Sequence, residues 1–431
     1  MRILHTADWH LGHTLRDHAR TAEHAHFLSW LVDTVVERRV DAVLIAGDVF
    51  DSANPPPAAW RMWFAFLGEL KQKKPDVQVV VIAGNHDSAA RLEAPRELLA
   101  AFDVRVVGRL GRAADGALKV DDVIVPLRDA SGEVVAQCVA IPFLRASDVT
   151  GLAPRDDEHD AEVVPRPVDP GRDPLIDGMR ALHEELFAAA RDRRTDGQAL
   201  VAMAHGYLVG GALSELSERK VLGGNQHALP VDLFPDDCAY TALGHLHRPQ
   251  AVGGVQRDEV RYSGSPIPLS MPERLHAHHV VFCDLDGAAV EKIWSLRTPR
   301  LVELVRLPER GELDPDAALQ AVEALPPRDD EMADDLRPLV EVAVRLEQPS
   351  PSVAERIARA IADRNARLVR VEVVLAGGPD SAPAAPRELA SLQPEEVFVR
   401  RYRRDFDGDV PAPLLRAFRE LLDEVEHGGS A

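Results

Sequence analysis

Five short segments of this chain place acidic, histidine and amide side chains where predicted strands end. One Asp-x-His or Gly-His sequence alone could be a surface loop or a turn with a hydrogen-bonded histidine. Five segments in this order, four of which contain a glycine that lets backbone approach closely, indicate one shared site. The segments are Asp8-Trp9-His10, Gly47-Asp48-Val49-Phe50-Asp51, Gly84-Asn85-His86-Asp87, Ala204-His205-Gly206 and Gly244-His245-Leu246-His247.

The donor types in these segments indicate a site for divalent metal ions. Carboxylate, imidazole and amide oxygen occur without thiolate, which favours manganese over structural zinc, with iron or magnesium less favoured. Two ions at one site need a carboxylate between them, and Asp48 is the best candidate for that bridge. Two dications offset by Asp8 and Asp48 leave a positive site that suits a phosphodiester anion and provides a nucleophile at neutral pH. The predicted chemistry is two-metal hydrolysis of a phosphoester.

The elements that must position these side chains alternate between strand and helix. An apolar strand at Arg2–Thr6 is followed by a helix with one apolar face and by a second strand at Ala42–Ala46. Such units build layered α/β domains, in which ligands bind beyond the carboxyl ends of the strands. The pattern continues with a helix at Ala58–Lys73, a strand at Val77–Ala83, a helix beginning near Leu92, and strands at Ala136–Pro142, Leu200–Ala204, Tyr240–Leu243 and His279–Leu285.

The later part of the chain predicts separate structural units. An acidic, proline-bearing stretch at about 150–174 predicts a surface insertion. A compact second domain is predicted from a strand at Leu301–Leu307, a helix at Pro315–Ala324, a strand at Leu339–Leu346, a helix at Ser352–Arg364 and a strand at Leu368–Leu375. A Gly/Pro/Ala linker leads to helical candidates at Pro394–Arg404 and Pro413–Glu426. The apolar stripe of the last helix either packs on its own domain or docks on a partner.

Length, charge and cysteine content bound the class of protein. A chain of 431 residues predicts two to three domains. Its formal net charge of −20 argues against a broad basic surface for nucleic acid, although a local site or a partner subunit can supply phosphate contacts. Three isolated cysteines, Cys138, Cys238 and Cys283, favour buried thiols over a disulfide or zinc framework. No secretory signal or membrane span is recognised, so we expect a cytoplasmic protein.

The five segments resemble the calcineurin-like metallophosphoesterase superfamily, and the resemblance covers about the first 285 residues. The sequences HTADWHLG, GDVFD, GNHD, GHLHRPQ and YSGSPIPLS are more similar still to nuclease subunits that process DNA double-strand breaks. The resemblance implies an α/β fold: a four-layer metallophosphoesterase sandwich with a small α+β capping domain and a C-terminal helical tail. It implies one metal ion at Asp8, His10, Asp48 and His247, and a second at Asp48, Asn85, His205 and His245.

Further roles near the metal segments also follow from the resemblance. His86 matches the family's catalytic histidine, which contacts the scissile phosphate and assists the leaving oxygen; the alternative is that it only orients Asn85. We expect Asp51 and Asp87 to support the ligands from behind.

Contacts to DNA are predicted from proximity in sequence to the metal segments. His13, Arg16 and Arg20 follow the first segment and Arg91 follows the third, and their alternative is solvated surface side chains. His276, His278 and His279 match no part of the family pattern, and we expect them at the surface and outside the site.

The resemblance also divides the chain and implies partners. We expect a phosphoesterase domain at 1–298, a capping domain over the active site at 299–376, a linker at 377–387 and a helical segment at 388–431. Leu392–Tyr402 resembles the segment that engages the coiled coil of an ATPase partner, so we expect the tail to dock there. Two nuclease and two ATPase chains are expected per complex, associated with the nucleoid when acting. The helix with Trp60, Trp63 and Phe64 is either core or dimer interface.

The predicted function is a manganese-dependent DNA nuclease that acts with the ATPase in DNA repair, recombination and replication. The resemblance implies duplex 3′–5′ exonuclease activity and endonuclease activity on single strands or hairpins. One alternative is a general phosphodiesterase or phosphatase with the same ligands, against which the capping domain and tail argue. Another is a binding module without turnover, which the intact ligand set disfavours.

Overall fold

The computed structural model describes residues 1–113, 117–149, 174–208, 229–252, 257–348 and 350–375, together with Phe398, Tyr402, Val410, Leu414 and Phe418. The chain divides into one unit of residues 1–219 and 225–376 and another of residues 220–224 and 377–431. All the helices and strands named below belong to the first unit. The expected acidic insertion and the two expected tail helices lie outside the described residues, apart from single positions in the tail.

The first sheet has six strands in the order β14-β13-β1-β4-β5-β6. Strands β1, β4, β5 and β6 are parallel, whereas β13 and β14 add antiparallel at the β1 edge. Their bounds are β1 Arg2–Thr6, β4 Ala42–Ala46, β5 Gln78–Ile82, β6 Val104–Val107, β13 His279–Asp286 and β14 Ala289–Arg297. The carboxyl ends of β1, β4 and β5 therefore meet at one edge.

The second sheet has six strands in the order β11-β12-β10-β9-β8-β7. Its inner strands β12, β10, β9 and β8 are parallel, and β11 and β7 are antiparallel to their neighbours. The bounds are β7 Ile124–Arg128, β8 Val134–Ile141, β9 Ala199–His205, β10 Tyr240–Gly244, β11 Gln250–Ala251 and β12 Val260–Tyr262. Here β9 and β10 end side by side, with His205 opposite Gly244.

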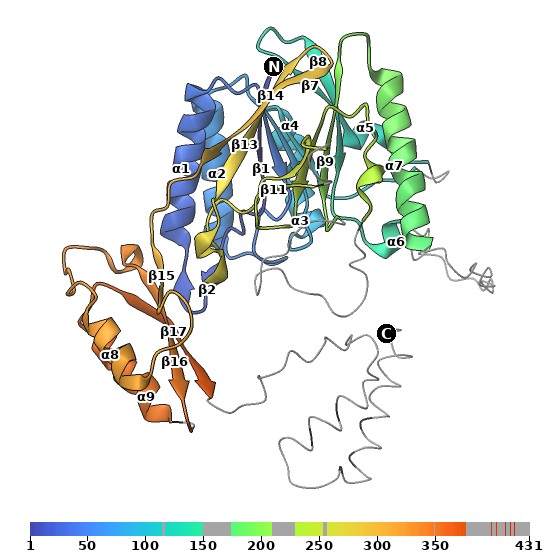
Figure 1. Ribbon diagram of the computed structural model, residues 1–431. Coiled ribbons are helices and arrows are strands. Elements are labelled where there is room, and N and C mark those ends of the chain that lie inside the picture. Colours follow the sequence, from blue (N-terminus) through green and yellow to red (C-terminus); the bar gives the residue numbers. More distant parts are fainter. Residues whose placement is uncertain are drawn as a thin grey trace. The chain divides into compact units, whose positions relative to one another are not determined.

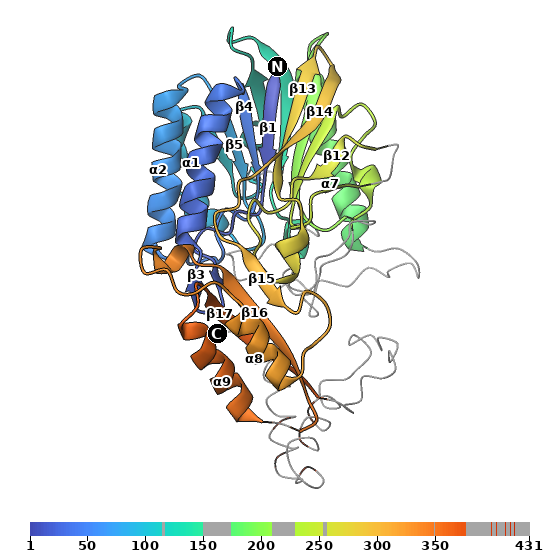
Figure 2. The ribbon, with the colours of Figure 1, turned by 60° about the vertical axis from the view of Figure 1, so that its left-hand side comes forward.

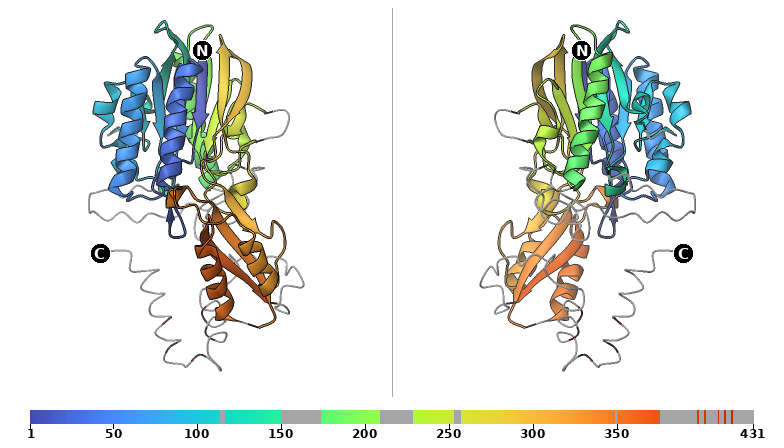
Figure 3. Two further views of the ribbon diagram at one scale, coloured as in Figure 1. Left: turned by 90° about the vertical axis from the view of Figure 1, so that its left-hand side faces the viewer. Right: turned by 90° about the vertical axis from the view of Figure 1, so that its right-hand side faces the viewer.

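The two sheets pack face to face between layers of helices (Figures 1 and 2). Alternate residues of β1 show the period of a strand, because Ile3 belongs to the core between the sheets and Leu4 to the core beneath helices α1 (Thr21–Glu37) and α2 (Pro57–Lys73). Helix α7 (Pro174–Arg193) packs against the second sheet with Leu182 and Leu186, on the opposite side of the molecule from α1 and α2 (Figure 3). The predicted four-layer α/β sandwich is confirmed.

Helix α7 was absent from the elements predicted from the sequence. It begins directly after the acidic stretch, in which no apolar periodicity is recognised. The helix nevertheless has an apolar face, which buries Leu175, Met179 and Phe187. The other predicted helices and strands of this region are present with shifts of one or two residues at their ends, except that the helix near Leu92 is two short helices, α3 (Ala89–Glu93) and α4 (Arg96–Ala100). The remaining short elements are β2 Thr14–Leu15, β3 His18–Ala19, α5 Val120–Val123, α6 Ala146–Val149, η1 Val231–Leu233, η3 Pro272–Leu275 and η4 Asp334–Leu336.

Residues 304–375 form a separate three-stranded parallel sheet in the order β15-β16-β17. Helices α8 (Pro315–Glu323) and α9 (Pro351–Ala362) connect its strands β15 (Leu304–Leu307), β16 (Leu339–Leu346) and β17 (Arg367–Leu375), and both cover one face (Figure 1). That face buries a small core that includes Val342, Val344 and Ile357. We call this subdomain the cap. Its first strand is shorter than the predicted Leu301–Leu307, because residues 301 and 302 instead join an apolar cluster with Leu15 and Met271 of the sandwich.

Candidate metal centre

The two sheets bring all five sequence segments to one edge. Asp8 and His10 follow β1, Asp48 and Asp51 follow β4, and Asn85, His86 and Asp87 follow β5, whereas His205 ends β9 and His245 and His247 follow β10. Each sheet is parallel at these strands, so its loops emerge at the same edge, and face-to-face packing joins the two edges.

The loops that carry the donors adopt uncommon backbone conformations. Asp8, His10 and Asp48 have left-handed φ values of 55°, 50° and 49°, which cost free energy for residues other than glycine. Close packing also requires glycine nearby, since a Cβ at Gly84 would collide with the Asp48 carboxylate and one at Gly244 with the Ala46 carbonyl. The surrounding fold therefore maintains a strained arrangement, a feature that is concentrated at functional sites.

Donor atoms from these loops cluster closely enough to surround metal ions. One atom each from Asp8, His10 and His247 lie within 4.8 Å of one another, and the same holds for Asp8, Asp48 and His205. Asp48 thus lies near both histidine groups, with its Oδ2 3.6 Å from His10 Nε2 and 3.4 Å from His205 Nε2.

Asn85 completes the cluster on the side of the second sheet. Its amide oxygen lies 2.9 Å from His205 Nε2 and 2.9 Å from His245 Nδ1. The backbone N–H of His245 donates to Asp8 Oδ1 at 2.9 Å, which ties the β10 loop to the β1 loop. An oxygen and two imidazole nitrogens therefore converge on one point, as the ligands of a cation do.

Two buried atoms at this edge lack hydrogen-bond partners within the described part of the chain: Asp8 Oδ2 and His10 Nε2. Both side chains are almost fully buried, with 0% and 2% of their surface exposed. A buried polar atom without a partner costs about 1–3 kcal/mol. A carboxylate oxygen and an imidazole nitrogen aimed into the same cluster fit divalent metal ions, which would supply the missing partner.

Without metal, Asp8 and His205 of this edge tend to retain a proton. Burial raises the pKa of Asp8 to about 7. Burial also opposes ionisation of Asp48 and His205, but their mutual attraction outweighs it, so the pKa of Asp48 falls well below its ordinary value and that of His205 rises to about 9. Because ligands bind metal in their deprotonated forms, metal binding here should release protons.

Asp51 and Asp87 support the edge from behind. Asp51 Oδ1 lies 3.2 Å from His10 Nδ1, which leaves His10 Nε2 facing the cluster. Asp87 accepts hydrogen bonds from the backbone N–H groups of Val49, Phe50 and Gly84, and so fixes the β4 and β5 loops together.

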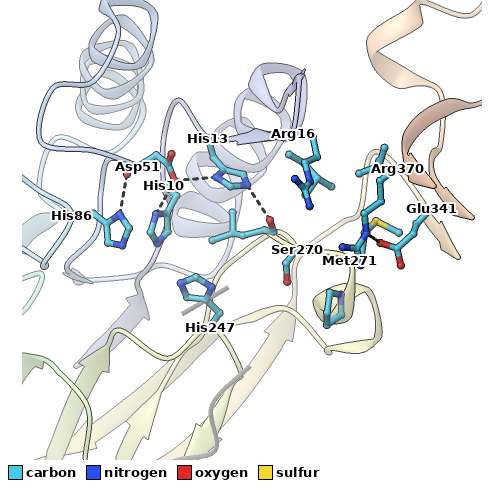
Figure 4. Close-up of a pocket in the computed structure, with 14 residues that line it drawn as sticks. His10, His13, Arg16, Asp51, His86, His247, Ser270, Met271, Glu341 and Arg370 are labelled. Carbon is cyan, nitrogen blue, oxygen red and sulfur yellow. Dashed lines mark hydrogen bonds and ion pairs between the residues drawn. The ribbon is translucent and has the colours of Figure 1, made fainter. Parts of the chain in front are cut away.

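His86 lies beside the cluster with one ring nitrogen engaged. Its Nδ1 donates to the carbonyl of Asp51 at 2.9 Å, and its backbone N–H donates to Asp48 Oδ1 at 2.8 Å. The imidazole packs edge-on against His10, with ring centroids 4.8 Å apart. Figure 4 shows His86, His10 and His247 together at one end of a pocket of about 260 Å³.

Glu273 is a member of the site that the sequence analysis missed. It is fully buried, and its Oε1 lies 3.1 Å from His247 Nδ1. Its other oxygen accepts from the backbone N–H of Leu269 at 2.8 Å, so the carboxylate orients the imidazole as the outer partners of metal-bound histidines do. The signal in the sequence was a lone acidic residue directly after an apolar stretch, where a buried carboxylate must find partners.

Comparison with known proteins agrees with this geometry. The family described as calcineurin-like phosphoesterase matches residues 1–249, and the C-terminal domain family of SbcD, described as type 5 capsule protein repressor C-terminal domain, matches residues 300–406. The SbcD subunit of nuclease SbcCD from Rhodobacter capsulatus is 38% identical over 93% of this chain and 94% of its own length. The proteins of the same name from Escherichia coli and Bacillus subtilis are 36% and 35% identical, over 69% and 66% of this chain and 68% and 66% of their own lengths.

The chain belongs to the SbcD family of calcineurin-like phosphoesterases. It is therefore a hydrolytic enzyme, as the site predicts, and the family resemblance seen in the sequence is confirmed. Within the described ranges, no helix of this SbcD-family chain is long and apolar enough to cross a membrane.

The residues of this SbcD-family chain that are predicted to contact DNA differ in burial and in hydrogen bonding. The prediction for Arg20 is wrong, because its side chain is buried, pairs with Glu23 and donates to the Pro268 carbonyl. Both ring nitrogens of His13 are engaged, by Asp51 and by the Leu269 carbonyl, so it braces the loop. Arg16 is exposed and lines the pocket.

Arg91 is exposed and bonds to Asn54 and the Ala53 carbonyl, in the loop after β4. Among the other histidines, the surface assignment is wrong for His278. It is buried and bridges the carbonyls of Ser265 and Glu273, so it holds the segment that presents Glu273.

Proposed function

We propose that this chain is a metal-dependent DNA nuclease that hydrolyses phosphodiester bonds with two divalent ions, preferentially Mn²⁺. The observation that carries the proposal is the convergence of seven donor residues, two of which have buried atoms without partners among the described residues. Beside them lies His86, whose Nε2 makes no hydrogen bond within the same ranges. The names of the relatives, which are nuclease subunits, support nucleic acid as the substrate.

The ligands divide between two positions. We assign Asp8, His10, Asp48 and His247 to one ion, and Asp48, Asn85, His205 and His245 to the other. The cluster of Asp8, His10 and His247 supports the first position. The contacts of Asn85 Oδ1 with His205 Nε2 and His245 Nδ1 support the second. The carboxylate, imidazole and amide donors, without thiolate, suit Mn²⁺.

When bound, the two ions supply Lewis-acid polarisation of the phosphoryl group and activation of a water molecule as nucleophile. His86 would stand beside the scissile phosphate. Because its Nδ1–H donates to the Asp51 carbonyl, its Nε2 is the atom that can hold a proton and give it to the leaving oxygen. Asp51 and Asp87 would keep the ligand loops in register with it.

The proposal is tested by comparing the purified wild-type chain with His86→Ala on linear duplex DNA, single-stranded DNA and bis(p-nitrophenyl) phosphate. We expect His86→Ala to retain bound manganese but to cut DNA about 10²- to 10⁴-fold more slowly. His26→Ala, which alters a half-exposed histidine of α1, is the matched control and should keep full activity.

A general phosphodiesterase would give a different result. Hydrolysis of the small ester by the wild type without cleavage of any DNA substrate, even with an ATPase partner and ATP present, would refute the nuclease proposal and leave the phosphoesterase. Equal activity of His86→Ala and wild type would instead refute the role of His86. Digestion of end-labelled duplex and of hairpin DNA separates 3′–5′ exonuclease from endonuclease activity.

The partner is proposed to be an SbcC-type ATPase with a coiled coil, in a complex of two copies of each chain at the nucleoid. The name of the relatives designates a subunit, and the C-terminal family match continues to residue 406, beyond the cap. We divide the chain into phosphoesterase domain 1–298, capping domain 299–376, linker 377–387 and partner-binding segment 388–431. Truncation after residue 387 should abolish co-purification with the ATPase but retain hydrolysis of the small ester.

A further inference from the structure

The face of the cap sheet that its helices leave uncovered carries a row of charged side chains. Strand register places Arg306 of β15 next to Glu341 of β16, and Glu341 next to Arg370 of β17. Glu372 lies two residues further along β17. The row therefore alternates arginine and glutamate across all three strands.

Hydrogen bonds join this row into one network. Glu341, only 2% exposed, accepts from Arg306 Nε at 3.2 Å and from Arg370 Nε. Glu372 accepts from Arg306 Nη2 at 3.2 Å and from Arg370 Nη2 at 3.1 Å. A guanidinium that two carboxylates hold in this way has little rotational freedom. The remaining nitrogen of Arg370, Nη1, makes no hydrogen bond within the described ranges.

Arg370 faces the metal centre across a shared pocket. The pocket of about 260 Å³ is lined at one end by His10, His86 and His247 and at the other by Glu341 and Arg370 (Figure 4). Between these ends the lining includes the apolar side chains of Leu15, Leu269, Met271 and Val369, together with His13 and Ser270.

The apolar cluster that contains Leu15, Met271 and Leu339 packs the cap against the sandwich at this place. Arg16 also lines the pocket, is exposed, and has no hydrogen bond or ion pair among the described residues. The pocket thus offers a metal-binding end, a largely apolar middle and an end to which Arg370 and Arg16 bring guanidinium groups.

We propose that Arg370, together with Arg16, binds the phosphate next to the scissile one, and that buried Glu341 is the residue that positions Arg370. The inference rests on the proposed nuclease function and names its substrate more closely: a polynucleotide with at least two successive phosphates. The cap is then part of the substrate site. Since the chain has a net charge of −20, general attraction cannot hold DNA here, and directed donors must do so.

The decisive experiment compares three substrates on the full chain with Mn²⁺. One is a dinucleoside monophosphate, which has only the scissile phosphate; the other two carry an added phosphate, one at the 5′ end and one at the 3′ end. We expect the wild type to have a higher kcat/KM for one of the two phosphorylated forms. In Arg370→Gln, this preference should fall by roughly tenfold to a hundredfold, the effect of one charge-assisted hydrogen bond.

Further variants separate binding from general damage to the cap. Arg370→Lys keeps the positive charge but lacks the planar guanidinium with its paired donors, so it should show more of the preference than Arg370→Gln. Glu341→Gln should lose part of it, because Arg370 is then less firmly directed. Arg356→Gln, which alters an exposed arginine on helix α9 that pairs with Asp316, is the matched control and should behave as wild type.

Binding without metal gives an independent measurement. In the presence of a chelator, the affinity of a fluorescent single strand should depend less steeply on salt for Arg370→Gln. The slope of log K against log salt should change by about 0.7 for each phosphate that the variant no longer binds. Arg356→Gln should keep the wild-type slope.

The outcomes distinguish the two proposals. If the wild type cleaves none of the three nucleotide substrates and no DNA, even with an ATPase partner and ATP, but hydrolyses bis(p-nitrophenyl) phosphate, the proposed nuclease function fails, and this inference fails with it. If the wild type cleaves all three nucleotide substrates equally, or if Arg370→Gln keeps the wild-type preference and salt slope, the nuclease stands and the role of Arg370 is refuted.

Discussion

The metal edge and the charged row of the cap line the same pocket but bury charge in opposite ways. At the metal edge, Asp8 Oδ2 and His10 Nε2 are buried without hydrogen-bond partners inside the described structure. In the cap, Glu341 is equally buried, yet two arginines bind both of its oxygens. Both arrangements are anchored on parallel strands, so the difference lies in the partners and not in the scaffold.

The metal edge and the cap network differ in whether their buried charges already have partners. A buried group without a partner is costly, so the metal edge is complete only with an external cation. The cap network is electrically balanced by itself, and its use is to fix the direction of one guanidinium. An incomplete cluster therefore indicates a ligand site, whereas a complete one indicates a positioning device.

The largest expected effect comes from removing the shared carboxylate of the metal edge. Asp48→Asn should lower hydrolysis of bis(p-nitrophenyl) phosphate by on the order of a thousandfold or more, because neither ion is then held and the nucleophile is lost. Elemental analysis should show the metal content falling in parallel. The control, Asp286→Asn, changes an exposed carboxylate at the end of β13. Full metal content in Asp48→Asn would contradict the bridging assignment.

A smaller effect is expected from Glu273, which acts on the metal edge through His247. Glu273→Gln keeps the size of the side chain but weakens the orientation of the imidazole. Metal affinity, measured by titration into the chelated protein, should fall about 10- to 100-fold. Turnover should recover at saturating metal. An unchanged affinity would show that Glu273 serves only to hold the Leu269 backbone.

Neutralising one carboxylate in each region should change the stability of the metal-free protein in opposite directions. Burial raises the pKa of Asp8 to about 7, so its charge opposes folding at pH 8, and Asp8→Asn should stabilise the protein by about 1–3 kcal/mol. Glu341→Gln should destabilise it by a similar amount, about 1–3 kcal/mol, since it weakens bonds to two arginines. Urea unfolding in chelator, followed by circular dichroism, measures both. Changes of the same sign would remove the distinction between the regions.

A buried histidine outside the metal edge predicts how the stability of the protein depends on pH. Burial lowers the pKa of His183, a buried residue of α7, to about 4. Above pH 6.5 the residue is neutral in both the folded and unfolded chain; below it the unfolded chain gains the proton first, so stability is lost as pH falls from 6.5 towards 4. At pH 5 the loss is about 2 kcal/mol for this residue.

Thermal unfolding between pH 7.5 and 5 should therefore show a shallower decline for His183→Leu than for the wild type. His26→Leu, at a half-exposed position of α1, should decline as the wild type does. Parallel curves for His183→Leu and wild type would mean that His183 does not contribute to acid sensitivity.

The sequence predicted the sandwich well because its signals are local. The apolar run of β1, the apolar face of α1, and a polar loop at each strand end are visible without tertiary contacts. The sequence did not predict α7, which follows an acidic stretch without apolar periodicity. It also led to a wrong prediction for Arg20. An arginine in a polar loop is expected to be exposed, but the Arg20 side chain is buried because it donates hydrogen bonds to Glu23 and to the Pro268 carbonyl.

Amino-acid order by itself determined the identities of the donors, their order at strand ends and the family, because parallel strands must gather their carboxyl ends at one edge. Only the tertiary structure decided which buried atoms remain without partners, since that depends on what every neighbour supplies. It also decided the roles of Glu273 and Arg370. These residues lie far in sequence from the segments they face, so no local pattern relates them. They come together because the cap and the η3 turn pack closely against the sandwich.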